Sequence, residues 1–136
     1  MHILGIDVGG SGIKGAIVDT TTGELLTEKF RLPTPRPALP EEVAKTVHQI
    51  VDHFNWKGEV GAGFPTPLFH GKCLSGGNLH PDWKGVQADE LFQSVTGLEF
   101  TVINDADAAA EAEMHFGAGK GKDGLVTVIT LGTGIG

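Results

Sequence analysis

The sequence is poor in cysteine and in positive charge, and each shortage excludes a class of protein. Its 136 residues include one cysteine, Cys73, so an internal disulfide is excluded and we expect a reducing, cytoplasmic location. Ten basic residues stand against 17 acidic ones, and the formal charge of −7 argues against nucleic acid or an anionic membrane as the main partner. No apolar run approaches the ~20 residues of a membrane span, and no charged leader with an apolar signal run precedes the first strand-like segment.

Two further patterns are missing. The six histidines show no HExxH or comparable spacing, so a metal site built from them is not expected. No short repeat is visible, which excludes solenoids and propellers. Glycine, in contrast, is abundant at 21 residues, and the excess sits in three clusters, at 9–15, 117–124 and 132–136.

Hydrophobic patterning predicts an α/β chain with a mixed sheet. The first three predicted strands follow one another closely enough to form an antiparallel meander, and Val43, Val47, Ile50, Val51 and Phe54 mark one buried helical face. The predicted strands are His2–Val8, Ile13–Asp19, Glu24–Leu32, Glu59–Phe64, Phe100–Ile103 and Leu125–Leu131, with a hairpin in Leu68–Leu74 and a loop in Asn78–Lys84. The predicted helices begin near Pro40, around Gln87 and at Asn104, and the last runs to about Phe116.

Residues Gly10–Gly15 spell G-x-G-x-x-G after a strand, a pattern shared with dinucleotide-binding folds. In those folds the glycines must open a helix, whereas Ala16–Asp19 predicts a strand here. One alternative is a β-hairpin whose glycine turn lets a phosphate approach backbone N–H groups, and another is a tight hairpin without a ligand. Asp7 would point at the same place, and a carboxylate normally reaches phosphates through Mg²⁺.

Two later segments add to this pattern. Leu131–Gly136 again combines the end of a strand with a glycine-rich turn and a hydroxyl residue, so it is a second candidate phosphate hairpin. Gly117–Lys122 lacks Gly-Lys-Ser/Thr and is interpreted as a hinge. Asn104 and Asp105 follow a buried strand, where open α/β sheets present ligand-binding groups, although both residue types also cap helices.

In combination these segments resemble the ROK family of bacterial sugar kinases, and within it the polyphosphate-dependent glucokinases and glucomannokinases. The segments that carry the resemblance are Asp7–Ala16, Thr34–Pro37, Asn104–Ala109 and Leu131–Gly136. The resemblance implies an actin-like, hexokinase-like ATPase fold of the ribonuclease H-like class, with a mixed five-stranded sheet and flanking helices. It also implies that residues 1–118 form the N-terminal lobe, and that 119–136 form a hinge with the first strand and glycine turn of a truncated C-terminal lobe.

The resemblance further implies that a phosphoryl group passes from polyphosphate or ATP to the 6-hydroxyl of glucose or mannose. Asp105 matches the catalytic base, and Asp7 would hold Mg²⁺. Lys14 is either a cation for the phosphate chain or a solvated strand lysine. The implied sugar contacts are Asn104, Asp105, Pro65, Thr66 and Asn78, and the implied donor contacts are Gly9, Gly10, Ser11, Gly12, Lys14, Gly132, Thr133 and Gly134.

Because half of such a cleft is missing from this sequence, we expect weak sugar binding and little or no catalysis by a monomer. Two alternatives stay open: a non-catalytic sugar- or phosphate-binding module, and a homodimer in which two copies rebuild a cleft. Trp83 could stack on a sugar or pack beneath its loop, and burial is the favoured use of so large an aromatic side chain.

Overall fold

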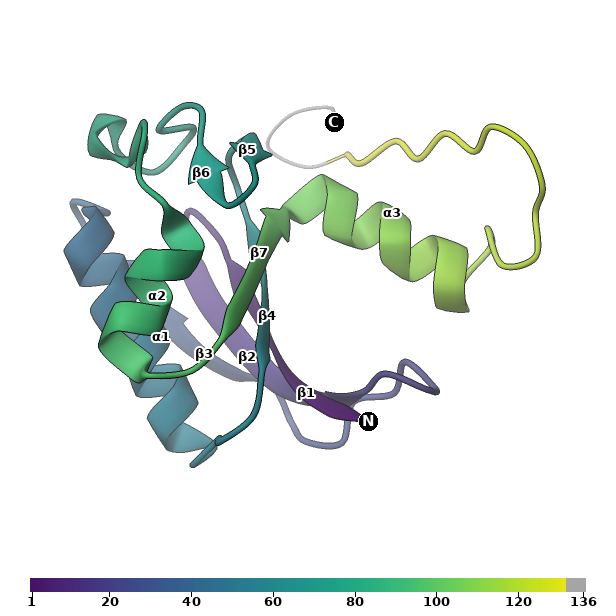
Figure 1. Cartoon of the computed structure of the whole chain (residues 1–136), viewed down its shortest axis with the longest axis horizontal. Helices are drawn as coiled ribbons and strands as arrows, with labels where there is room; N and C mark the ends of the chain where they lie inside the picture. The colour runs from purple at the N-terminus through teal and green to yellow at the C-terminus, as the bar shows by residue number, and fades with distance from the viewer. Residues whose placement is uncertain (132–136) are drawn as a thin grey trace.

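The computed structural model describes residues 1–131 and is built on one five-stranded mixed sheet (Figure 1). Its strand order is β3-β2-β1-β4-β7. The first three strands are antiparallel neighbours, whereas β1, β4 and β7 run parallel, which confirms the predicted meander and mixed sheet. The strands are β1 (His2–Val8), β2 (Gly12–Asp19), β3 (Phe30–Pro33), β4 (Val60–Phe64) and β7 (Phe100–Asn104), and β5 (Leu68–Phe69) and β6 (Lys72–Cys73) form a separate hairpin.

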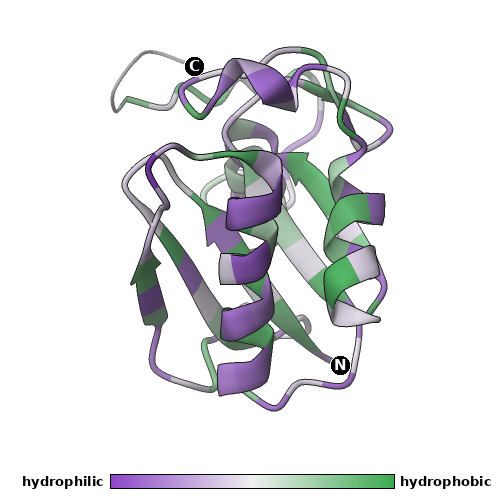
Figure 2. Cartoon of the chain, turned by 90° about the vertical axis from the view of Figure 1, so that its left-hand side faces the viewer, coloured by the Kyte–Doolittle hydropathy of each residue, from purple (hydrophilic) through white to green (hydrophobic). Residues whose placement is uncertain are grey.

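Helices cover both faces of the sheet. Helices α1 (Pro40–His53) and α2 (Ala88–Thr96) lie on one face and α3 (Asp105–Phe116) on the other (Figure 1). Helix α1 begins with Pro40 at its first position and has acidic residues in its first turn, as the sequence predicts. Its hydrophilic residues face outward in Figure 2, while Val43, Val47 and Ile50 are buried against the sheet.

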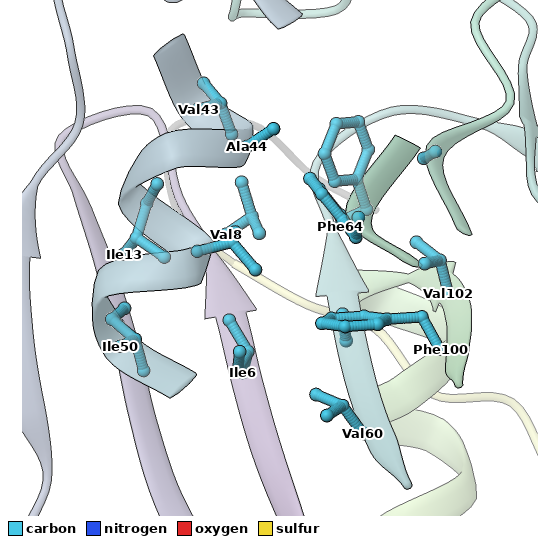
Figure 3. Close-up of a cluster of buried hydrophobic side chains, with 14 of the residues drawn as sticks. Ile6, Val8, Ile13, Val43, Ala44, Ile50, Val60, Phe64, Phe100 and Val102 are labelled. Carbon is cyan, nitrogen blue, oxygen red and sulfur yellow. The ribbon is translucent and has the colours of Figure 1, made fainter. Parts of the chain in front are cut away.

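The core lies between the sheet and the α1–α2 layer. Alternation along β1 buries Leu4, Ile6 and Val8 on this side, and Figure 3 shows the strand side chains meeting those of α1. Trp83, in the short 3₁₀ helix Pro81–Trp83, is fully buried, and its ring centroid lies 4.7 Å from that of Phe64. This burial confirms packing as the role of Trp83.

A row of small residues crosses the opposite face of the sheet. Cross-strand pairing places Ala16, Gly5, Gly61 and Thr101 in one row across β2, β1, β4 and β7. These residues form the floor of an open groove of about 670 Å³, whose lining includes Ala108 and Ala112 of α3 and Leu25. Ile3, Val18 and Ile103 also line this groove, and Ile103 is exposed, so apolar surface on this face is left uncovered.

The strand expected over Glu24–Leu32 is shorter than predicted. Only Phe30–Pro33 joins the ladder, and Leu25 forms a single bridge with Val18. The reason is local: the side-chain hydroxyl of Thr27 accepts the Ile17 N–H at 3.0 Å, in place of a backbone carbonyl. A side-chain oxygen therefore satisfies a donor that a regular ladder would have used.

The strand expected over Leu125–Leu131 is wrong for residues 125–130, which form no strand in the structure. The segment follows a glycine-rich turn in which Gly121 and Gly124 have positive φ, and Leu125, Ile129 and Leu131 are exposed. A β-branched sequence alone does not make a strand, because its backbone groups need a neighbouring strand in register. None of the strands described provides that register to residues 125–130.

We predict that Trp83→Phe lowers the free energy of unfolding by about 2 to 4 kcal/mol. The change removes buried volume and the indole N–H, which donates to the Ala38 carbonyl at 2.9 Å. Trp56→Phe is the matched control, because its indole N–H donates to the Glu59 carbonyl at the exposed surface. Urea unfolding measures both, and equal losses would contradict the packing role of Trp83.

Cys73 gives a second prediction. Burial raises the pKa of its thiol, so the native side chain stays protonated at neutral pH, and only the thiolate is a good nucleophile. Iodoacetamide should modify the native chain at least about tenfold more slowly than the urea-unfolded chain. Equal modification rates in the two states would contradict the burial.

The raised pKa also predicts a pH dependence of stability. Because the folded state holds its thiol proton to higher pH, the free energy of unfolding should fall as the pH rises above ~8.5, the pKa of a free thiol.

Candidate active site

The candidate site residues gather at one edge of the sheet. Strands β1, β4 and β7 are parallel, so their carboxyl ends meet at this edge. Asp7 lies near the end of β1, Pro65 and Thr66 directly follow β4, and Asn104 and Asp105 join β7 to α3. The open α/β sheet therefore brings together residues nearly one hundred positions apart, at the edge where such sheets bind ligands.

The first glycine cluster forms a tight turn between two strands, which excludes the dinucleotide-binding interpretation. The Gly9 N–H donates to the Gly12 carbonyl at 3.0 Å, and a Cβ on Gly9 would lie 2.8 Å from that oxygen, so only glycine fits. The Thr34 hydroxyl donates to the Gly9 carbonyl and ties the turn to the loop after β3. Gly10 and Ser11 are exposed at the tip, where a ligand can reach the backbone.

Asp7 and Lys14 are cross-strand neighbours beside this turn. The Lys14 ammonium lies 3.4 Å from an Asp7 carboxylate oxygen, and both side chains are about half exposed. An ion pair this exposed contributes little to stability. Lys14 is therefore placed next to the candidate phosphate turn without being committed to a structural role.

Asn104 connects two parts of the site. Its side-chain oxygen accepts the Ala106 N–H at 3.0 Å, which confirms that it caps α3. Its amide donates to the Thr66 carbonyl at 3.0 Å and to the Phe64 carbonyl at 3.4 Å. One side chain thus fixes both the start of α3 and the loop after β4.

Asp105 is the first residue of α3, and its carboxylate is exposed. One of its oxygens accepts the Ala106 N–H at 2.8 Å, and the positive end of the helix dipole favours its charge. The start of α3 lies close to β4: a Cβ on Gly63 would be in ordinary van der Waals contact with the Asp105 Cα, at 3.8 Å. Asp105 therefore has a defined position and an accessible proton acceptor.

The loop expected to line a sugar pocket is held against the site. Gly77 has φ +54°, and a Cβ there would lie 2.9 Å from the Pro65 carbonyl oxygen, so the loop that carries exposed Asn78 packs on Pro65 and Thr66. The Thr66 side chain is fully buried, and its hydroxyl faces the Pro67 carbonyl at 3.4 Å. Gly132, Thr133 and Gly134, the expected second hairpin, lie outside the described residues.

Arg31 is a candidate that the sequence analysis missed. Its guanidinium donates to the Ser11 carbonyl at 3.0 Å and covers the Cα of Gly12. Arg31 becomes a candidate because it pairs with Lys14 in the β2–β3 ladder. The sequence does not show this pairing, because the irregular segment before β3 hides the register of the two strands.

Within residues 1–131, no three His, Cys, Asp or Glu side chains form a cluster able to hold a metal ion by themselves. In the same part of the chain, no helix has both the length and the apolar character needed to span a bilayer.

We predict that Asn104→Ala lowers the free energy of unfolding by about 2 kcal/mol, from the lost cap and the lost bonds to the β4 loop. Asn104→Asp keeps an oxygen for the cap but loses the amide donor, so it should cost less than Asn104→Ala. Urea unfolding of the two variants separates the cap from the tether. If both variants lost the same free energy of unfolding, the oxygen that caps α3 would contribute nothing.

Comparison with known proteins identifies a family whose members match nearly the whole chain. The sequence matches the model of the ROK family over residues 3–136. It is 47% identical to the polyphosphate glucokinase of Mycobacterium tuberculosis H37Rv, over 99% of this chain and 51% of that protein. The chain thus spans about half the length of the curated relatives it matches.

Two solved structures support the fold. The inorganic polyphosphate/ATP-glucomannokinase from Arthrobacter sp. strain KM superposes with a TM-score of 0.94 at 46% identity, covering 99% of this chain and 56% of that one. A ROK family glucokinase from Streptomyces griseus, solved with glucose and AMPPNP, gives a TM-score of 0.78 at 31% identity, covering 100% and 43%. The expected actin-like sugar-kinase fold is confirmed, and the chain belongs to the ROK family.

Proposed function

We propose that this chain supplies the donor turn and the catalytic base of a kinase that transfers a phosphoryl group from polyphosphate or ATP to the 6-hydroxyl of glucose or mannose. The observation that carries the proposal is the meeting of the Gly9–Gly12 turn, Asp7 and Asp105 at one sheet edge. Phosphoryl transfer needs positioned phosphates, neutralised charge and an acceptor for one proton, and these groups can provide all three. The names of the relatives point to the same reaction.

The turn binds the donor. Gly9, Gly10, Ser11 and Gly12 let phosphate oxygens approach backbone N–H groups, and Lys14 adds a positive charge beside them. Gly132, Thr133 and Gly134 are proposed to form a second turn of the same kind. In this proposal residues 1–118 are the N-terminal lobe, and 119–136 begin a second lobe across the cleft.

Asp7 fits a magnesium ion of the kind that phosphate enzymes use. Mg²⁺ typically takes one or two carboxylates and completes its shell with water and substrate phosphates, so a cage of protein ligands is not required. The Asp7 carboxylate is about half exposed beside the turn, and Lys14 approaches only one of its oxygens. The ion would neutralise charge on the donor phosphates.

Asp105 accepts the proton of the sugar 6-hydroxyl as that oxygen attacks the terminal phosphorus. The carboxylate is exposed toward solvent at the start of α3, while Asn104 holds this start against the loop after β4. Asn104 therefore orients the base and the pocket together. Pro65, Thr66 and Asn78 are proposed to line the sugar pocket, with Thr66 contributing through its backbone because its side chain is buried.

We predict that these 136 residues alone bind glucose and tripolyphosphate weakly and form little glucose 6-phosphate, because they supply only one side of the proposed cleft. Whatever turnover they show should fall about 10²- to 10⁴-fold in Asp105→Asn, the usual contribution of a general base. Asp107→Asn is the matched control, since Asp107 is exposed in the same first helical turn.

Coupled detection of glucose 6-phosphate, with polyphosphate and with ATP, measures turnover, and calorimetry measures binding. Full turnover in Asp105→Asn, or no binding of either ligand by the folded parent chain, would overturn the proposal. A turnover rate per chain that rises with the concentration of the parent chain would favour a homodimer.

A further inference from the structure

Charged side chains form a row across three strands beside the Gly9–Gly12 turn. Asp7 on β1 pairs in register with Lys14 on β2, and Lys14 pairs with Arg31 on β3. Directly opposed residues of antiparallel strands project from the same face, and neighbouring strands lie ~4.8 Å apart. The two cations therefore follow Asp7 at regular steps toward the β3 edge of the sheet.

This row is aligned with the proposed catalytic base. Asp105 follows β7, the outermost strand on one side of the sheet, Asp7 lies on the central strand β1, and Arg31 lies on β3, the outermost strand on the other side. A donor whose terminal phosphate is near Asp105 and Asp7 would reach Lys14 and then Arg31 as it runs across the strand ends. Arg31 is thus farthest from the unit that is transferred.

Arg31 is also held in place. One N–H donates to the Ser11 carbonyl at 3.0 Å, and the guanidinium lies against Gly12, where a side chain would displace it. A guanidinium carries five N–H donors in a rigid fork suited to phosphate oxygens, so this single bond leaves further donors for an anion.

We propose that Arg31 binds a phosphate unit of the donor beyond those held by the glycine turn and Lys14, and so favours a long polyphosphate. A polyphosphate carries negative charge on every unit, whereas the phosphates of a nucleotide end in an uncharged ribose. The row of cations should therefore bind a donor more tightly when that donor carries negative charge along its whole length. This inference rests on the proposed function, because it needs the turn to hold the donor.

The test measures binding of tripolyphosphate and of long-chain polyphosphate to the chain by calorimetry at several salt concentrations. Arg31→Gln removes the charge but keeps an N–H donor for the Ser11 carbonyl. Lys57→Gln is the control. It removes one positive charge from the exposed loop before β4, at the amino end of that strand and away from the glycine turn. The melting temperature of each variant reports any change in folding.

We expect Arg31→Gln to weaken long-chain binding about three- to tenfold at low salt, the range for one charge-assisted contact. The slope of log affinity against log salt should fall in magnitude by about 0.7 to 0.9, as for one lost phosphate contact in a nucleic acid. Tripolyphosphate affinity should change less than about twofold, because the turn and Lys14 remain. Lys57→Gln should leave both affinities and the slope unchanged.

Long-chain affinity and salt slope that stay at parental values in Arg31→Gln would overturn the inference and leave the proposed function standing. An equal loss for both ligands would also overturn it, because Arg31 would then act only by holding the turn. Failure of the parent chain to bind tripolyphosphate would overturn the proposed function, and the inference with it.

Discussion

The parallel pairing of β1, β4 and β7 is the constraint on which the rest of the molecule depends. Parallel strands end at the same edge, so the residues that follow each of them are brought together whatever their separation in sequence. The glycine turn after β1, the loop at Pro65 after β4 and the start of α3 after β7 lie together because of this pairing. The hydrophobic layer of α1 and α2 holds the sheet, and within residues 1–131 the amino ends of the three parallel strands carry none of the candidate groups.

The side chain of Asn104 both stabilises the fold and positions the proposed base. Its amide and its carbonyl oxygen bind the β4 loop and the first turn of α3, so the carboxylate of Asp105 is fixed relative to the loop. A helix cap alone would not need the amide donor, and a loop tether alone would not need the oxygen. The position therefore favours asparagine over aspartate, serine or threonine, which cap helices but lack the amide.

Much of this could be predicted from the sequence, because alternation and helical periodicity report burial directly. The buried face of α1 is of this kind, and residue type alone favours a cap at Asn104. What could not be predicted depends on register or on a partner. The side chain of Thr27 replaces part of the β3 ladder, and Arg31 becomes a candidate only when its place opposite Lys14 is known. The apolar run at residues 125–130 has no neighbouring strand among residues 1–131.

Helix α3 has no buried residue, and the side-chain bonds that anchor its start are concentrated at Asn104 and Asp105. A rod of 12 residues is about 18 Å long, and at its far end the Phe116 ring lies against Gly23, where a Cβ would be 2.8 Å from it. A rotation of about 10° at its base would carry the other end, near Phe116, through about 3 Å. Such a rotation would separate Phe116 from Gly23, so the helix is held at two places: this contact and the Asn104–Asp105 junction that carries the proposed base.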